Sequence, residues 1–224
     1  MARQKLSERI LPDYTKGEEI FNMVSHIVGG AVGVATLVLC VVFAAVQRNP
    51  YGVVGGAIFG ASLIILYANS SIYHGLKPSL TAKKVFQIMD HCSIFFLIAG
   101  TYTPIALVAL REFSPLLGWG IFAVVWVAAI VGITLNSIDI KSYRKFSAVC
   151  YLAMGWCIVF AWSAADFMAA RGGLLLLLIG GICYTVGALI YYLLKKKRYA
   201  HSIFHLFVLA GSILHSLYVM IFIL

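Results

Sequence analysis

The sequence predicts an all-α integral membrane protein, built as a bundle of seven transmembrane helices with a cytoplasmic N-terminus and an extracytoplasmic C-terminus. Three observations lead to this prediction. The 224 residues are 62% hydrophobic and only 11% charged, with a mean hydropathy of +0.97, whereas soluble domains carry about 25% charged residues. The chain contains seven apolar runs, each long enough to cross ~30 Å of hydrocarbon as a helix. Basic residues are concentrated in every second connection between those runs.

The chain divides into a polar arm and one membrane domain. Residues 1–20 form a cytoplasmic arm of mixed charge, typical of either a short interfacial helix or a disordered segment. Residues 21–224 form the seven-helix domain. In chain order, the apolar runs predict helices over 21–46, 52–76, 84–109, 116–136, 143–164, 173–194 and 200–223.

The distribution of Lys and Arg predicts the orientation. Of the 17 basic residues, all but Arg48, Arg111 and Arg171 lie in the N-terminal arm and in the connections after the second, fourth and sixth runs. The positive-inside rule assigns those connections to the cytoplasm. The net charge of +9 is therefore a topology signal, and no nucleic-acid partner is expected.

Ionisable residues inside the apolar runs gather at one depth. His74 closes the second predicted helix, Asp90 and His91 lie near the start of the third, and His201 and His205 open the seventh. All three helix ends face the cytoplasm in the predicted topology. Because ionisable groups in a membrane are costly and mark functional sites, we expect these helices to share a site at the inner face.

The histidines predict a zinc site. His201 and His205 are four residues apart, on one face of a helix, so both imidazoles can bind one metal ion. Taken alone, the pair is also consistent with two interfacial histidines wetted by the preceding basic loop. With His74 they form a tripod of neutral ligands that leaves a fourth position open for water, whose pKa zinc lowers to about 7.

Two further residues are candidates for chemistry at this site. Asp90 can accept a proton from the metal-bound water or orient it. Ser70 lies one turn before His74 on the same face, so its hydroxyl can reach the water or a substrate oxygen. The alternative for Ser70 is a hydrogen bond to the carbonyl four residues earlier in its own helix.

The remaining polar residues at this depth receive weaker assignments. Glu19, Asn22 and His26 share one face of the first helix and either support a metal ligand or form an ordinary polar interfacial turn. His91 points about 100° away from Asp90 and is interpreted mainly as a packing histidine. His215 lies about 15 Å beyond His205 along the last helix, so we expect it to hydrogen-bond across helices instead.

Several short polar motifs follow one another along the predicted helices. They are Ser70-x-x-x-His74, Met89-Asp90-His91 leading into Gly100-Thr101-Tyr102-Thr103-Pro104, and His201-x-x-x-His205, with Glu19, Asn22, Ser25 and His26 in the first helix. From the first helix to the last, the chain resembles the bacterial hemolysin III family, which is related to the progestin and adipoQ receptors, including the adiponectin receptors, and more distantly to the alkaline ceramidases.

The resemblance implies a multi-pass protein of the bacterial plasma membrane with zinc on His74, His201 and His205, and with Asp90 and Ser70 beside it. It also implies membrane lipids as partners and hydrolysis of a lipid amide such as ceramide, or of another fatty-acyl substrate. Two hypotheses remain open. The protein is either a zinc-dependent hydrolase of lipid amides or esters, or a non-enzymatic regulator of membrane homeostasis, lipid sensor or cytolytic pore former with structural zinc. If Asp90 binds the zinc ion as a fourth ligand, the second hypothesis, a non-enzymatic protein with structural zinc, is favoured.

Overall fold

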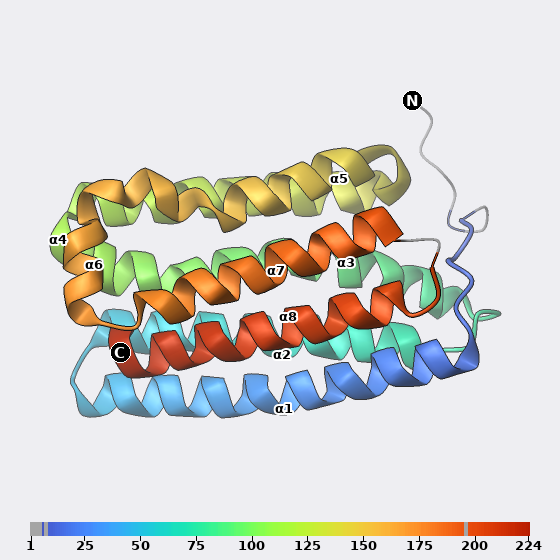
Figure 1. The fold of residues 1–224 in the computed structure, drawn as a ribbon, viewed down its shortest axis with the longest axis horizontal. Coiled ribbons are helices and arrows are strands. Elements are labelled where there is room, and N and C mark those ends of the chain that lie inside the picture. The colour runs from blue at the N-terminus through green and yellow to red at the C-terminus, as the bar shows by residue number, and fades with distance from the viewer. Residues whose placement is uncertain (1–5, 7–8, 195–196) are drawn as a thin grey trace.

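Every regular secondary-structure element in the described part of the protein is a helix. A computed structural model describes Leu6, residues 9–194 and residues 197–224, and shows no strand within them. The long helices run roughly side by side and form an elongated bundle (Figure 1). In this bundle α1 packs on α2, α2 on α3, α3 on α5 and α7 on α8, while α8 also contacts α1.

The elements follow in chain order as α1 (Lys16–Val46), α2 (Pro50–Gly75), α3 (Thr81–Pro104), a π-helix (Ile105–Leu110), α4 (Arg111–Phe113), α5 (Pro115–Gly155), a 3-10 helix (Cys157–Ala164), α6 (Ala165–Arg171), α7 (Leu174–Leu194), α8 (Ala200–Tyr218) and a terminal π-helix (Val219–Ile223). Six helical stretches among the described residues are long and apolar enough to span a membrane. The predicted all-α membrane architecture is therefore confirmed.

The fourth stretch, Pro115–Arg171, folds back on itself. Its 57 residues would reach about 85 Å as one straight helix, roughly twice the thickness of a bilayer. The backbone leaves helical geometry at Asp139, with φ −160° and ψ 102°. Figure 1 shows the chain running along the bundle in the first part of α5, turning, and returning beside itself toward α6. The break lies between the predicted helices 116–136 and 143–164.

Polar contacts hold the two legs of this stretch together. The Ser147 hydroxyl donates to Asn136 Oδ1 at 2.7 Å, and Asn136 Nδ2 donates to the Tyr151 hydroxyl at 3.2 Å. Asp139 accepts hydrogen bonds from the Lys141 amide and the Ser142 hydroxyl, so it caps the start of the return leg. The turn is thus built from residues that satisfy the groups exposed by the break.

The N-terminal arm ends earlier than predicted. Thr15 and Glu18 form a capping box, so α1 begins at Lys16 rather than near residue 21. Residues 9–15 contain no helix. Two parts of the prediction lie outside the described residues. They are the interfacial helix over residues 1–5 and 7–8 and the loop lysines Lys195 and Lys196.

Close packing of α1 on α2 brings the first turn of α1 to the last turn of α2. Side chains larger than hydrogen do not fit at two crossing points. A Cβ on Gly29 would overlap the Tyr67 ring, and a Cβ on Gly60 would overlap the Leu37 backbone. Small residues at such positions let membrane helices approach closely. As a result, Glu19 in α1 reaches His74 in α2.

Candidate metal centre

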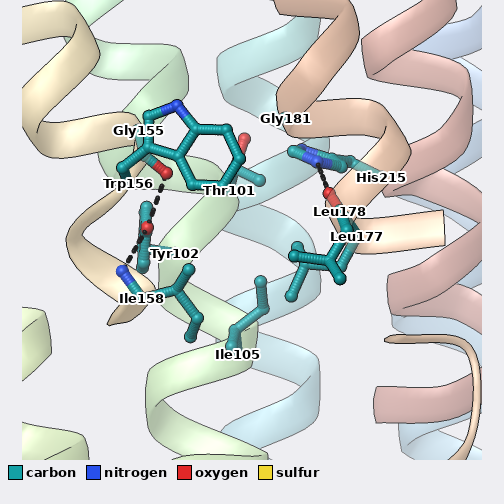
Figure 2. Close-up of a pocket in the computed structure, with 10 residues that line it drawn as sticks. All are labelled: Thr101, Tyr102, Ile105, Gly155, Trp156, Ile158, Leu177, Leu178, Gly181 and His215. Carbon is teal, nitrogen blue, oxygen red and sulfur yellow. Dashed lines mark hydrogen bonds between the residues drawn. The ribbon is translucent and has the colours of Figure 1, made fainter. Parts of the chain in front are cut away.

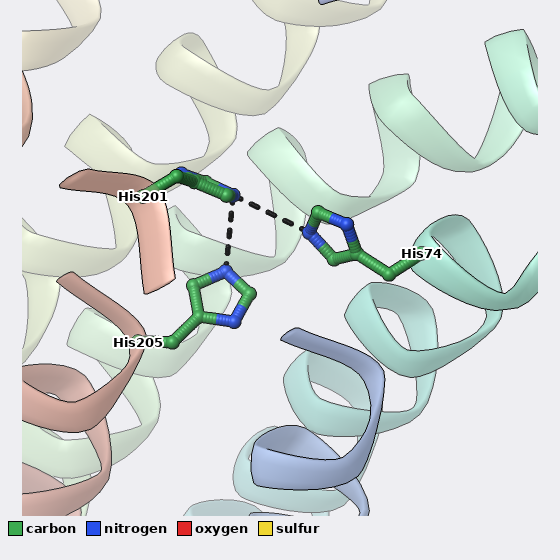
Figure 3. Close-up of side chains that lie close together, drawn as sticks. All are labelled: His74, His201 and His205. Carbon is green, nitrogen blue, oxygen red and sulfur yellow. Dashed lines mark hydrogen bonds between the residues drawn. The ribbon is translucent and has the colours of Figure 1, made fainter. Parts of the chain in front are cut away.

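Three histidines from two helices meet at one end of the bundle. His74 comes from the last turn of α2, and His201 and His205 come from the first turns of α8 (Figure 3). His201 Nε2 lies 3.3 Å from His74 Nε2 and 3.0 Å from His205 Nε2. His74 and His205 are only 3% and 1% exposed. The structure thus brings together the three residues predicted to be ligands.

The spacing of these nitrogens fits a metal ion. Nitrogen ligands at about 2.0–2.1 Å from a tetrahedral ion are about 3.3–3.4 Å apart, close to the two measured separations, and all three ligand atoms lie within 4.8 Å of one another. A single N–H between His201 and one neighbour satisfies only one of the two contacts. A shared cation satisfies both, so the donor set matches a divalent metal.

Glu19 fixes the orientation of the His74 ring. Its Oε2 lies 2.6 Å from His74 Nδ1. Because a carboxylate only accepts hydrogen bonds, Nδ1 carries the hydrogen and the Nε2 lone pair faces the other histidines. Pairs of this kind orient histidine ligands at metal sites. The structure therefore brings Glu19 to the place where a supporting residue is needed.

Tyr14 covers the same group from the N-terminal arm. Its ring stacks on His201, with centroids 5.1 Å apart and planes at 14°. Burial, with smaller contributions from the nearby Tyr191, Tyr73, Asp90 and Glu19, raises the pKa of the Tyr14 hydroxyl far above its usual value. Tyr14 therefore stays protonated. No sequence pattern distinguished this tyrosine from other aromatic residues.

His26 and Asn22 lie against the histidine group from α1. The His26 ring stacks on His205, with centroids 3.6 Å apart, and neither of its nitrogens has a hydrogen-bond partner among the described residues. Asn22, one turn earlier, is fully buried, and its side-chain amide likewise lacks a partner there. Buried polar groups are rarely left unpaired. The unpartnered atoms of His26 and Asn22 therefore favour a polar ligand next to the histidines.

Ser70 shows the same behaviour in α2. Its hydroxyl is fully buried and has no hydrogen-bond partner in the described part of the chain. The alternative interpretation, a bond to its own helix four residues back, is therefore wrong. Ser71 makes that bond instead, donating to the Tyr67 carbonyl at 2.7 Å. The hydroxyl of Ser70 remains available beside His74.

Asp90 and His91 lie further from the three nitrogens. Asp90 is half-buried in α3, and its carboxylate does not belong to the group of ligand atoms within 4.8 Å found among the described residues. It is near enough for its charge to act on the Tyr14 hydroxyl. His91 Nδ1 contacts the Gln87 carbonyl of its own helix at 2.9 Å, as a packing histidine would.

Lys83 also supports the site. Its place in the sequence predicts a basic residue of a cytoplasmic connection, but α3 begins at Thr81, and Lys83 is only 1% exposed in the first turn of that helix. Its ammonium group donates to Glu19 Oε1 at 2.8 Å. Nothing in the local sequence separates Lys83 from its neighbour Lys84, because the difference arises only when α1, α2 and α3 pack together.

A small cavity lies elsewhere in the bundle and does not belong to this centre. It has a volume of about 30 Å³ and lies among α3, the α5 end, α7 and α8 (Figure 2). His215 lines it and donates from Nε2 to the Leu177 carbonyl at 3.0 Å, which confirms the expected bond across helices. The Tyr102 hydroxyl bridges the nearby junction between α5 and the 3-10 helix, donating to the Gly155 carbonyl and accepting from the Ile158 amide.

Comparison with known proteins identifies the family. The family profile described as Haemolysin-III related matches residues 14–216, nearly the whole chain. The chain belongs to this family. It is 37% identical to Hemolysin-3 of Bacillus cereus over 207 residues, which cover 92% of each protein. The resemblance noted from the motifs is thereby confirmed.

More distant members of the wider family are also similar. The human monocyte to macrophage differentiation factor is 29% identical over 165 residues, covering 70% of this chain and 66% of that protein. The adiponectin receptor protein of Drosophila melanogaster is 25% identical over 232 residues, covering 88% of this chain and 49% of the receptor. Together with the six apolar stretches, this hemolysin III membership indicates a multi-pass membrane protein, and the Bacillus relatives point to the plasma membrane.

Proposed function

We propose that this hemolysin III family protein binds zinc through His74, His201 and His205 near the cytoplasmic face and hydrolyses a lipid amide, such as ceramide, or a lipid ester. The observation that carries the proposal is the convergence of the three Nε2 atoms, at separations suited to one tetrahedral ion. The substrate class is supported by the location of the site within a membrane bundle and by the family resemblance.

The proposal includes seven membrane crossings. The break at Asp139 and the contacts between the two legs support counting the stretch Pro115–Arg171 as two spans. α1 begins and η4, the terminal π-helix, ends at opposite ends of the bundle in Figure 1, as an odd number of spans requires. The concentration of basic residues at the end where α1 begins supports a cytoplasmic N-terminus.

The residues around the centre support hydrolysis. A zinc ion held by His74, His201 and His205 would supply Lewis acidity and would lower the pKa of a water molecule at the open position. Ser70 donates its unpaired hydroxyl to the substrate carbonyl oxygen, where charge develops during attack. Asp90 takes up the proton of the attacking water and returns it to the leaving amine or alcohol. Glu19 holds His74 in the orientation that the site needs.

The number of ligands favours a catalytic over a structural ion. Structural zinc sites are usually closed by four protein ligands, whereas catalytic sites keep one position open. Among the described residues the group comprises three histidines, without Asp90. This supports an open position and leaves Asp90 to act on protons rather than on the metal.

The test is a substrate screen in defined detergent or vesicles. Purified wild-type protein with zinc is offered lipid amides, including ceramides, and lipid esters, and free fatty acid is measured. Release by wild type but not by His205→Ala supports the proposal. If wild type releases no fatty acid from any of these lipids with zinc present, the enzymatic proposal is wrong.

A cytolytic function is the second candidate, favoured by the name of the Bacillus cereus relative, Hemolysin-3. It is tested by adding the purified protein to erythrocytes and to dye-loaded vesicles. Lysis by wild type and by His205→Ala to the same extent would indicate a membrane activity that does not need the metal. If lysis is lost in His205→Ala, the lytic activity instead depends on the metal centre.

A further inference from the structure

Lys83 occupies a position that its own helix disfavours. It lies in the first turn of α3, where the helix dipole repels a positive charge, and it is only 1% exposed. Burial of an unpaired ammonium is strongly unfavourable. The placement is therefore stable only because other elements supply partners for the charge.

The partners come from the two neighbouring helices. Lys83 Nζ donates to Glu19 Oε1 at 2.8 Å, to the Tyr73 carbonyl at 2.9 Å and to the Leu76 carbonyl at 3.0 Å. These bonds use all three donors of an ammonium group. The two carbonyls belong to the C-terminal end of α2, which a helix leaves without internal partners and where a cation is favourable.

Both sets of contacts lead to His74. The capped end of α2 carries His74 in its last turn. The other oxygen of the Glu19 carboxylate lies 2.6 Å from His74 Nδ1. Lys83 therefore holds the backbone that carries this ligand and also the carboxylate that orients its ring. Because Lys83 binds one oxygen of the partly exposed Glu19 carboxylate, it helps to keep the other oxygen turned toward the imidazole.

We infer that Lys83 is a positioning residue for the metal centre, acting through Glu19 on His74. The inference rests on metal binding in the proposed function and does not depend on hydrolysis. A purely structural cap of α2 predicts lower stability with unchanged metal affinity in the folded protein. A positioning role predicts weaker metal binding in protein that is still folded.

The experiment measures zinc affinity of purified variants by competition with a chromophoric chelator. Lys83→Met removes the charge, and Lys77→Met makes the same change at an exposed lysine in the preceding loop. We expect Lys83→Met to weaken zinc binding by about 10–100-fold, as loss of a supporting partner does, while Lys77→Met matches wild type. Lys83→Arg should restore part of the affinity. Size-exclusion profiles confirm that the compared proteins are folded.

A double-mutant cycle tests the route through Glu19. Glu19→Gln cannot accept from His74 and Lys83 at the same time, so we expect it to weaken binding about as much as Lys83→Met does. The double variant should then bind zinc no more weakly than the single variant with the lower zinc affinity. The visible spectrum of bound cobalt(II) should change in both single variants and not in Lys77→Met.

The outcomes separate this inference from the proposed function. Unchanged zinc affinity and an unchanged cobalt spectrum in Lys83→Met would overturn the positioning role and leave the metal proposal standing. Losses that multiply in the double variant would overturn the route through Glu19. If Lys83→Met does not fold, unchanged zinc affinity and cobalt spectrum in Glu19→Gln overturn the inference. A wild-type protein that binds no metal overturns both proposals.

Discussion

At the scale of single residues, the three histidines are not equivalent. His74 is held by Glu19 through a contact between residues 55 positions apart. His205 is packed between the ring of His26 and its own helix, and is almost fully buried. His201 is more exposed and is covered by Tyr14. Loss of the His205 side chain should therefore leave a buried gap next to the other two histidines.

The first prediction concerns metal content. His205→Ala should lose most of the approximately one zinc per chain that wild type binds, because two imidazoles leave the ion under-coordinated. Elemental analysis after dialysis measures this. His215→Ala is the matched control, since it removes a buried histidine from the same helix outside the group. Equal zinc in His205→Ala and wild type would show that the tripod is wrong.

The second prediction concerns Asp90. Asp90→Asn preserves shape but cannot accept the proton, so it should retain zinc while lipid hydrolysis falls by about 10²–10⁴-fold. Zinc content and fatty-acid release are measured on the same sample. Loss of zinc from this variant would make Asp90 a fourth ligand and favour the structural role of the metal.

At the scale of elements, the first turn of α1 connects the two helices that carry the histidines. Glu18 Oε1 accepts from the backbone amide of Tyr199 at 2.7 Å, just before α8, where Tyr199 adopts the left-handed conformation. The adjacent Glu19 contacts His74 near the end of α2. Two neighbouring carboxylates of α1 thus contact the start of α8 and the end of α2, which makes α1–α2 packing important for the site.

The third prediction tests this packing. Gly60→Ala introduces a methyl group that overlaps the Leu37 backbone, so it should destabilise the protein by about 1–3 kcal/mol and lower its thermal midpoint. Gly120→Ala is the control, since an added Cβ there meets nothing within 4 Å. It should be neutral or slightly stabilising, because alanine favours helix more than glycine does. Equal midpoints for the two variants would contradict the close approach of α1 and α2.

At the scale of the whole molecule, the elongated bundle presents apolar side chains to its surroundings and keeps polar ones inside. Exposed residues such as Val127, Ile130 and Phe160 face outward, as a lipid environment requires. Inside, hydroxyl groups link distant helices: Tyr67 donates to Ser212 at 2.7 Å, between α2 and α8. Such bonds are expected where hydrocarbon offers polar groups no other partner.

The fourth prediction concerns topology. A reporter fused after Leu224 should be active only on the extracytoplasmic side, because fourteen of the 17 basic residues belong to the arm and connections assigned to the cytoplasm. Paired phosphatase and fluorescent-protein fusions measure this, with fusions at the N-terminus as the internal comparison. Cytoplasmic activity of the C-terminal fusion would overturn the seven-span orientation.

The sequence by itself determined the membrane class, the approximate positions of the helices and the three histidines that meet. Run length and composition suffice for the first two, because hydrocarbon thickness sets how many apolar residues a helix needs. For His201 and His205 a spacing of four is enough, since one helical turn brings them together. His74 was predicted to join them because the end of its helix and the start of the last helix lie at the same face of the membrane.

Only the tertiary structure decided how these residues are supported. Glu19 was one of several polar residues on its helix face, and its contact with His74 depends on how closely α1 packs against α2. The sequence predicts that Lys83 is a charged loop residue. Folding instead buries it against α1 and α2, where it contacts Glu19, 64 positions away in sequence, and Tyr73, 10 positions away. Ser70 was ambiguous because its own helix offers a carbonyl. Such contacts join residues far apart in the chain, so local pattern carries no information about them; they arise only when the helices pack.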